Sequence, residues 1–144
     1  MDTDTSRHTG LEHLSEHDCF VLMGSTHFGR IGVTVNALPA ILPVHFALLG
    51  RDPVFRTDAG AKLMAASAGQ VLCLEVDHFD AEAHSGWSVS ITGTAHVLTE
   101  PVDLERATTL PLRPWVGHGD AYVRIDATIV SGRHVGGHLP PGAR

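Results

Sequence analysis

The chain has 144 residues, of which 43% are hydrophobic and 18% charged, and its formal net charge is -6. Such a length and composition are typical of one globular domain that buries a hydrophobic core and needs no disulfide bonds or metal ions for stability. The negative charge argues against nucleic-acid binding, and no apolar run approaches the roughly 20 residues of a membrane span. Because the polar N-terminus also lacks the apolar core of a secretory signal, we expect a cytoplasmic protein.

The cysteines and histidines predict neither a disulfide framework nor a metal centre. Cys19 and Cys73 lie in apolar sequence, which is typical of buried free thiols. Among the eleven histidines, His13 and His17 have the spacing that places two imidazoles on one helix face. No further ligand follows at the spacing of a zinc site, so we expect no metal site.

The pattern of apolar, turn and capping residues predicts a chain of short strands with a few short helices. In chain order we expect a disordered start at 1–10, a helix at 15–24, strands at 28–36, 40–49 and 53–57, a helix at 58–67, strands at 70–76 and 86–98, a helix at 101–110, a strand at 121–130 that 132–135 extends or follows, and a flexible tail at 136–144.

Individual residues sharpen some of these predictions. Ser15 is expected to cap the first helix. Pro43 inside a strand predicts a bulge or an unpaired edge position, because proline has no N–H for the ladder. Residues 70–76 are mostly apolar and predict a strand buried on both faces, followed by a polar connection at 77–85. Gly93 predicts a bend or bulge in the long strand.

Tight turns between successive strands indicate antiparallel pairing, and the positions that favour bulges indicate a strongly curved sheet. We therefore expect a mainly β domain at 11–135, folded as a closed or partly split antiparallel β-barrel.

The segment from Pro53 to Ser67 brings together groups that suit an anion. A short strand ends near Thr57, a turn follows, and Lys62 lies in the first turn of the next helix. A hydroxyl, an ammonium and the unpaired N–H groups of a helix start suit a phosphate monoester. The alternative, that Thr57 or Asp58 merely caps a surface helix and Lys62 is solvated, stays open at this point.

Several motifs, taken in their order and spacing, resemble the pyridoxamine 5'-phosphate oxidase-like, flavin-nucleotide-binding split-barrel family. The resemblance covers roughly residues 11–135 and is carried by the segments 28–33, 39–46, 54–57, 60–63, 86–89, 112–115, 123–125 and 131–133. It implies a homodimer of split β-barrels with two cofactor sites at the subunit interface. FMN is the usual ligand in that family, and some relatives use the deazaflavin F420.

The resemblance also assigns residues to the cofactor. It implies that the isoalloxazine ring is edged by Pro43, Val44, His45 and Phe46. The ribityl phosphate would be held by Phe55, Arg56, Thr57 and Lys62, and the pocket would be closed by Trp87 and Ser88. Arg113 and Trp115 would reach across from the partner subunit.

Two of these residues carry alternatives. Arg56 either binds the phosphate or is an ordinary solvated residue, since it points opposite to its strand neighbours. His45 is the candidate catalytic residue, because an imidazole beside a flavin could donate a proton to a small-molecule substrate. Its other interpretation is a strand histidine packed under the ring or at the dimer interface.

The resemblance leaves the function open between two classes. The first is a flavin- or F420-dependent oxidoreductase that acts on a small organic substrate, with the hydride chemistry supplied by the cofactor. The second is a non-catalytic FMN, F420 or haem carrier, and an empty structural dimer is a third reading. The chain lacks the C-terminal Arg- and His-bearing segment with which pyridoxamine phosphate oxidases grip their substrate, which argues against that reaction.

Overall fold

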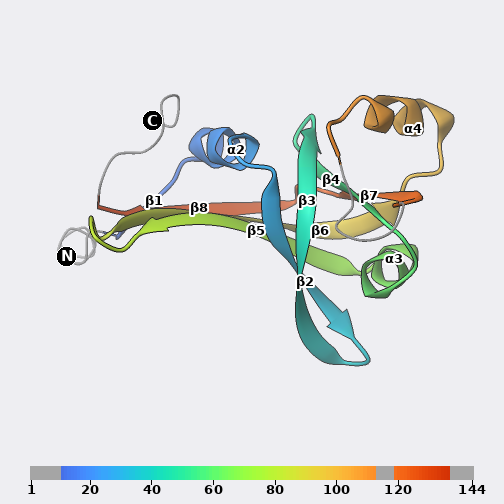
Figure 1. Ribbon diagram of the computed structural model, residues 1–144, viewed down its shortest axis with the longest axis horizontal. Coiled ribbons are helices and arrows are strands. Elements are labelled where there is room, and N and C mark those ends of the chain that lie inside the picture. The colour runs from blue at the N-terminus through green and yellow to red at the C-terminus, as the bar shows by residue number, and fades with distance from the viewer. Residues whose placement is uncertain (1–10, 113–118, 137–144) are drawn as a thin grey trace.

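The computed structural model describes residues 11–112 and 119–136, which form eight strands and three helices (Figure 1). In chain order the elements are β1 (Leu11–His13), α2 (Glu16–Gly24), β2 (Phe28–Val35), β3 (Leu38–Leu49), β4 (Asp52–Thr57), α3 (Ala61–Ser67), β5 (Val71–Asp80), β6 (Ser85–Val97), α4 (Pro101–Thr108), β7 (Ala121–Ile125) and β8 (Ile129–Val135). The predictions for residues 1–10 and 137–144 lie outside the described residues.

All strand pairings are antiparallel, and six strands close into a barrel in the order β6-β5-β2-β3-β4-β7. Closure depends on the length of β6, whose second half pairs with β7 while its first half pairs with β8. Strands β8 and β1 therefore extend the sheet beyond the barrel. The prediction of a mainly β, antiparallel split barrel is confirmed.

The core fills the barrel, with α3 packed against β2, β6 and β7 and α2 packed against β6 and β8. The largest fully buried side chains come from α2 and from all six strands of the barrel, and they include Leu22, Met23, Ile31, Phe46, Phe55 and Leu74. A smaller cluster of Ala47, Val54, Leu98, Ala107 and Leu112 packs at α4. None of the helices in the described residues is long and apolar enough to cross a membrane.

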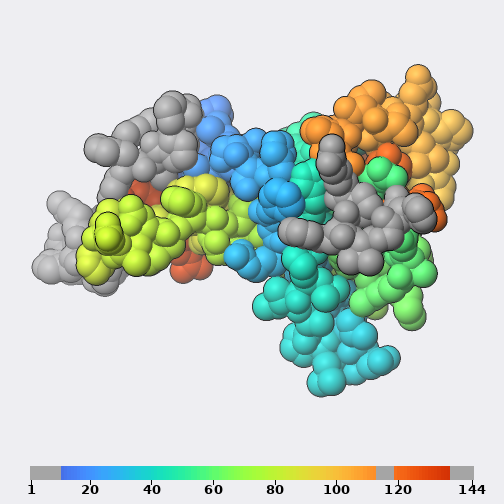
Figure 2. Space-filling model, viewed as in Figure 1, coloured from blue at the N-terminus to red at the C-terminus, as the bar shows by residue number. Residues whose placement is uncertain are grey.

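Local signals in the first third of the chain are confirmed. The Ser15 hydroxyl accepts a hydrogen bond from the Asp18 N–H and caps α2. Asn36 and Ala37 both have positive φ, as a two-residue hairpin turn requires, and they join β2 to β3. The hairpin projects from the body of the molecule as a separate arm (Figures 1 and 2).

Three predictions about the sheet were wrong. Strand β5 runs on to Asp80, so residues 77–80 are strand rather than connection. It is buried on one face only, because no layer covers the other side of the sheet in the described residues. The final strand is two strands, β7 and β8, separated at residues 126–128, and β1 was not expected. Cys73 is accordingly half-buried, whereas Cys19 is buried, and both thiols are free.

Gly93 lies where β6 exchanges β8 for β7 as its partner. Thr92 is the last residue paired with β8, and Ala95 is the first paired with β7. A Cβ atom at Gly93 would overlap the backbone carbonyl oxygen of Asp126, in the connection between β7 and β8. The glycine is thus required for close backbone approach, a role that glycine in a strand interior commonly has.

Replacing Gly93 with Ala should destabilise the protein by about 2–3 kcal/mol, because a backbone oxygen cannot rotate away from the new methyl group. Urea unfolding checks this. Gly32→Ala is the matched control in β2, where a Cβ atom has its nearest neighbours 3.9 Å away. Equal losses in the two variants would contradict this role of Gly93.

Candidate functional site

Strand β3 changes partners in its middle. Residues 38–45 pair with β2, whereas residues 46–49 pair with β4. The Phe46 N–H still donates to the His27 carbonyl of the β2 side, at 2.8 Å. The opposite edge of residues 38–45 therefore has no strand beside it in the described residues. Pro43 lies on this edge, which confirms the prediction of an unpaired edge position.

Lys62 from α3 bonds to that open edge. Its Nζ donates to the Pro43 carbonyl oxygen at 3.4 Å and lies 5.7 Å from the centroid of the Phe55 ring. It is the only lysine in the chain. Burial lowers the pKa of Lys62 below its ordinary value of 10.5. Within residues 11–112 and 119–136 no carboxylate forms an ion pair with this ammonium, so a partly desolvated positive charge faces the edge of β3.

Thr57 is the last residue of β4 and precedes the junction that leads to α3 and this lysine. Thr57 is almost fully buried, and its hydroxyl donates to the Asp58 carbonyl at 3.2 Å. Gly60 is the N-cap residue of α3, and no side chain caps the helix. The alternative reading, in which Thr57 or Asp58 caps the helix, is therefore wrong. Asp58 instead accepts a hydrogen bond from the Asp120 N–H at 3.0 Å.

Arg56 points to the other side of β4. Its Nε donates to the Gly119 carbonyl at 3.0 Å, and its guanidinium lies 5.4 Å from the centroid of the Tyr122 ring. Tyr122 is its cross-strand neighbour on β7. One chain therefore separates Arg56 from Lys62, whereas it brings Lys62 to Pro43 and Phe55.

The four residues assigned to the ring divide into two pairs. Val44 and Phe46 are fully buried in the core, so only their backbone atoms are available at the edge. Pro43 and His45 have their side chains on the opposite, more exposed face of β3. Phe55 is also fully buried, beneath Lys62. The side chains of Val44 and Phe46 are therefore not available to edge the ring.

His45 packs against the start of β2. It lies opposite Phe28 in the ladder, with ring centroids 4.8 Å apart, and the His27 ring lies 6.0 Å away. His27 was not found by sequence reasoning, because it is 18 positions from His45 and only the hairpin register brings the two together.

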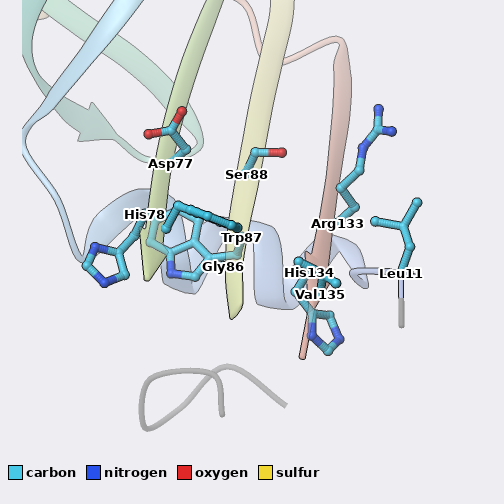
Figure 3. A pocket seen from close by; sticks show the side chains of 10 residues that line it. Leu11, Asp77, His78, Gly86, Trp87, Ser88, Arg133, His134 and Val135 are labelled. Carbon is cyan, nitrogen blue, oxygen red and sulfur yellow. The ribbon is translucent and has the colours of Figure 1, made fainter. Parts of the chain in front are cut away.

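Trp87 and Ser88 lie elsewhere, near the start of β6. Ser88 pairs with Asp77 of β5 and Arg133 of β8, and Trp87 pairs with His78 and His134. Both residues line a cleft of about 320 Å³ formed by β1, β5, β6 and β8 (Figure 3). No residue of β3, β4 or α3 lines it. A single chain thus does not bring Trp87 and Ser88 to Lys62, and Arg113 and Trp115 fall outside the described residues.

The corner of Pro43, Thr57 and Lys62 fits a phosphate group. A phosphate oxygen would give the Lys62 ammonium the anionic partner that it lacks within the described residues, and charge-assisted hydrogen bonds of this kind are among the stronger ones in proteins. Within the same residues, no three histidine, cysteine, aspartate or glutamate side chains gather as a metal site would need.

Comparison with known proteins agrees with the fold. The family model described as pyridoxamine 5'-phosphate oxidase matches residues 15–134. An uncharacterized protein of Mycobacterium tuberculosis, Rv0080, is 35% identical over 125 residues, which are 83% of this chain and 82% of that protein.

Solved structures give the same result. The structure of an FAD binding protein from Mycobacterium smegmatis superimposes with a TM-score of 0.74 at 33% identity, and the match covers 87% of this chain and 98% of that one. An FAD and heme binding protein from the same organism has a TM-score of 0.67 over 91% of this chain and 75% of its own. Its 14% identity shows the shared fold alone. The chain belongs to the pyridoxamine 5'-phosphate oxidase family.

Proposed function

We propose that this protein binds a flavin nucleotide, with FMN as the first candidate, and uses it as an oxidoreductase on a small organic substrate. One observation carries the proposal. The only lysine of the chain is half-buried at the unpaired edge of β3, without a carboxylate partner in the described residues.

The phosphate is the part of the ligand that this corner would recognise. A phosphate monoester carries a charge of about -1.5 to -2 at neutral pH and offers three acceptor oxygens. Lys62 would donate to one of them, and the nearby Thr57 hydroxyl could turn from the Asp58 carbonyl toward another. Because the anion stabilises the protonated amine, binding should raise the pKa of Lys62 back toward its ordinary value.

The ring would lie along the open edge of β3. The backbone groups of residues 43–45 that face away from β2 can bond the polar rim of an isoalloxazine. Pro43 and His45 would flank the ring with their side chains. His45 keeps both interpretations, proton donor and packed strand histidine, and its contact with Phe28 supports the second.

The choice of cofactor follows the phosphate. FMN and F420 each carry a phosphate group. The Mycobacterium smegmatis protein described as FAD-binding is 33% identical to this chain, which makes FAD a further candidate. The bound flavin would supply the hydride chemistry, while this chain binds, orients and shields it. A carrier without turnover is the competing outcome, and assays of the loaded protein with NADPH or reduced F420 separate the two.

Lys62→Ala should weaken FMN binding about tenfold or more, the factor that one charge-assisted hydrogen bond is worth. Riboflavin has the same ring without the phosphate, so its affinity should change little. Fluorescence titration of both flavins checks this.

Met64→Ala is the matched control, because Met64 is exposed on the same short helix. It should leave both affinities unchanged. Equal weakening of riboflavin and FMN by Lys62→Ala, or no effect on either, would contradict the assignment of the phosphate to this corner.

We further propose that the protein is a homodimer formed through the outer face of the sheet. This outer face is the side of β2, β3, β5, β6 and β8 that points away from the core, and the ladder registers place on it the exposed apolar residues Phe28, Ile41, Val71, Phe79 and Ile129. Of the eight large apolar residues that are exposed in the described part of the chain, five thus share one surface, which is typical of an interaction site.

The charges on the outer face are compatible with burial. Arg30 bonds to Glu75 at 2.7 Å and to Asp77 at 3.3 Å. Burial and then the neighbouring Asp77 raise the pKa of Glu75. This cluster neutralises much of its own charge, as the centre of a protein interface requires. Ser88 also lies on this face. In the proposed dimer, each cofactor site would therefore be closed by Ser88 of the partner subunit.

Phe28→Asp or Ile41→Asp should convert the dimer to a monomer, because either change buries an unpaired charge in the interface. Sedimentation velocity measures the result. Val102→Asp is the control, since Val102 is 68% exposed on α4, away from the sheet. A monomeric wild type, or a dimer that survives both sheet variants, would contradict the proposed interface.

A further inference from the structure

A groove of about 540 Å³ lies between α2 and the turn that joins β3 to β4 (Figure 1). Its apolar lining consists of Phe20, Val21 and Leu48, which are half-buried and pack against the core. The exposed side chains of Glu16 and Arg51 also line it. The groove is therefore on the core side of the sheet, opposite to the outer face, and its volume lies within the range of small-molecule pockets.

Both walls of the groove are fixed by contacts elsewhere in the fold. Three side chains of α2 belong to the buried core cluster. The other wall is a two-residue hairpin turn of Gly50 and Arg51, in which Gly50 has the positive φ, 64°, that such turns require. The Asp52 carboxylate that follows accepts a hydrogen bond from the Ala127 N–H at 2.9 Å. A ligand would thus enter a preformed groove, which lowers the ordering cost of binding.

Arg51 reaches from the turn to α2 and makes two contacts there. Its guanidinium lies 4.5 Å from the centroid of the Phe20 ring, and it forms an ion pair with Glu16. Glu16 and Phe20 are four positions apart, so one face of the helix provides both contacts. The Arg51 side chain is nevertheless 60% exposed. The guanidinium is therefore held in place while much of its surface stays open to a ligand.

The ion pair leaves the groove without net charge. Among the described residues that line it, no aspartate, glutamate, lysine or arginine is present besides Glu16 and Arg51. An anion would gain Arg51 only by displacing Glu16, and a cation would gain Glu16 only by displacing Arg51. Because each exchange replaces one exposed ion pair with another, a charge on the ligand adds little affinity. Apolar contact and stacking remain as the sources of binding energy.

We propose that this groove binds a neutral, planar aromatic molecule that stacks on the Arg51 guanidinium and covers Val21 and Leu48. A guanidinium is planar and weakly hydrated, so aromatic rings stack on it more readily than on an ammonium. The groove shares no residue with the flavin corner of Pro43, Thr57 and Lys62 or with the apolar residues of the outer face. The inference therefore goes beyond the proposed flavin site and the proposed dimer and depends on neither.

Calorimetric titration with three matched probes tests the inference on the full chain in its own oligomeric state. The probes are 2-naphthalenemethanol, 2-naphthoate and 2-naphthylmethylammonium, which share one ring system and are neutral, anionic and cationic. We expect saturable binding of the neutral probe and weaker binding of both charged probes. Arg51→Ala should weaken binding of the neutral probe about fivefold, the factor that one partly desolvated cation–π contact is worth.

Two further variants separate stacking from charge. Arg51→Lys keeps the positive charge but loses the planar face, so it should weaken the neutral probe nearly as much as Arg51→Ala does. Glu16→Gln frees the charge of Arg51 and keeps its ring contact, so 2-naphthoate should become the preferred probe. Arg106→Ala, at an exposed position of α4, is the control for loss of a surface arginine. Lys62→Ala separates the groove from the flavin corner, and both controls should leave the neutral probe unchanged.

Absence of saturable binding of 2-naphthalenemethanol to the wild type would overturn the inference. Equal effects of Arg51→Ala and Arg106→Ala, or wild-type affinity in Arg51→Lys, would also overturn it, as would an unchanged order of the probes in Glu16→Gln. Loss of FMN binding in Lys62→Ala with the neutral probe still bound would support both sites at once. Far-ultraviolet circular dichroism establishes that each variant is folded before titration.

Discussion

The exchange of partners along β3 is the feature on which the site depends. Residues 38–45 of β3 pair with β2, and residues 46–49 pair with β4. The barrel closes only because of this exchange, and the same exchange leaves an open backbone edge at Pro43. α3, which follows β4, then brings the only lysine of the chain to that edge. Closure of the barrel and the proposed anion site thus have one structural cause.

Several features follow from short-range chemistry and could be predicted from the sequence. The Ser15 cap, the β2–β3 hairpin and the edge position of Pro43 each depend on a residue and its immediate neighbours. The strand, turn and helix that run from Pro53 to Ser67 could also be predicted, because they depend on neighbouring residues alone. The resemblance to a family also implied a split β-barrel, although the order of its strands was not predicted.

Other features depend on contacts between distant positions and could not be predicted from one sequence. The outer face of β5 was predicted to be buried, since Val71 and Cys73 are apolar, but only topology decides whether a layer covers a sheet. Arg56 had two interpretations, phosphate ligand or solvated residue that points opposite to its strand neighbours, and neither included its contact with Tyr122. Trp87 and Ser88 were placed beside Lys62, although they lie on a part of β6 that faces a different cleft.

Selective acetylation of Lys62 tests the central claim most directly, because this lysine is the only one in the chain. The protein would be treated with limiting acetylating reagent and the Lys62 peptide quantified by mass spectrometry, with the N-terminal amine as internal reference. We expect saturating FMN to slow acetylation of Lys62 about tenfold or more, because the phosphate would cover the amine and favour its protonated form. Riboflavin should give little protection. An unchanged rate with FMN, or equal protection by riboflavin, would contradict the account.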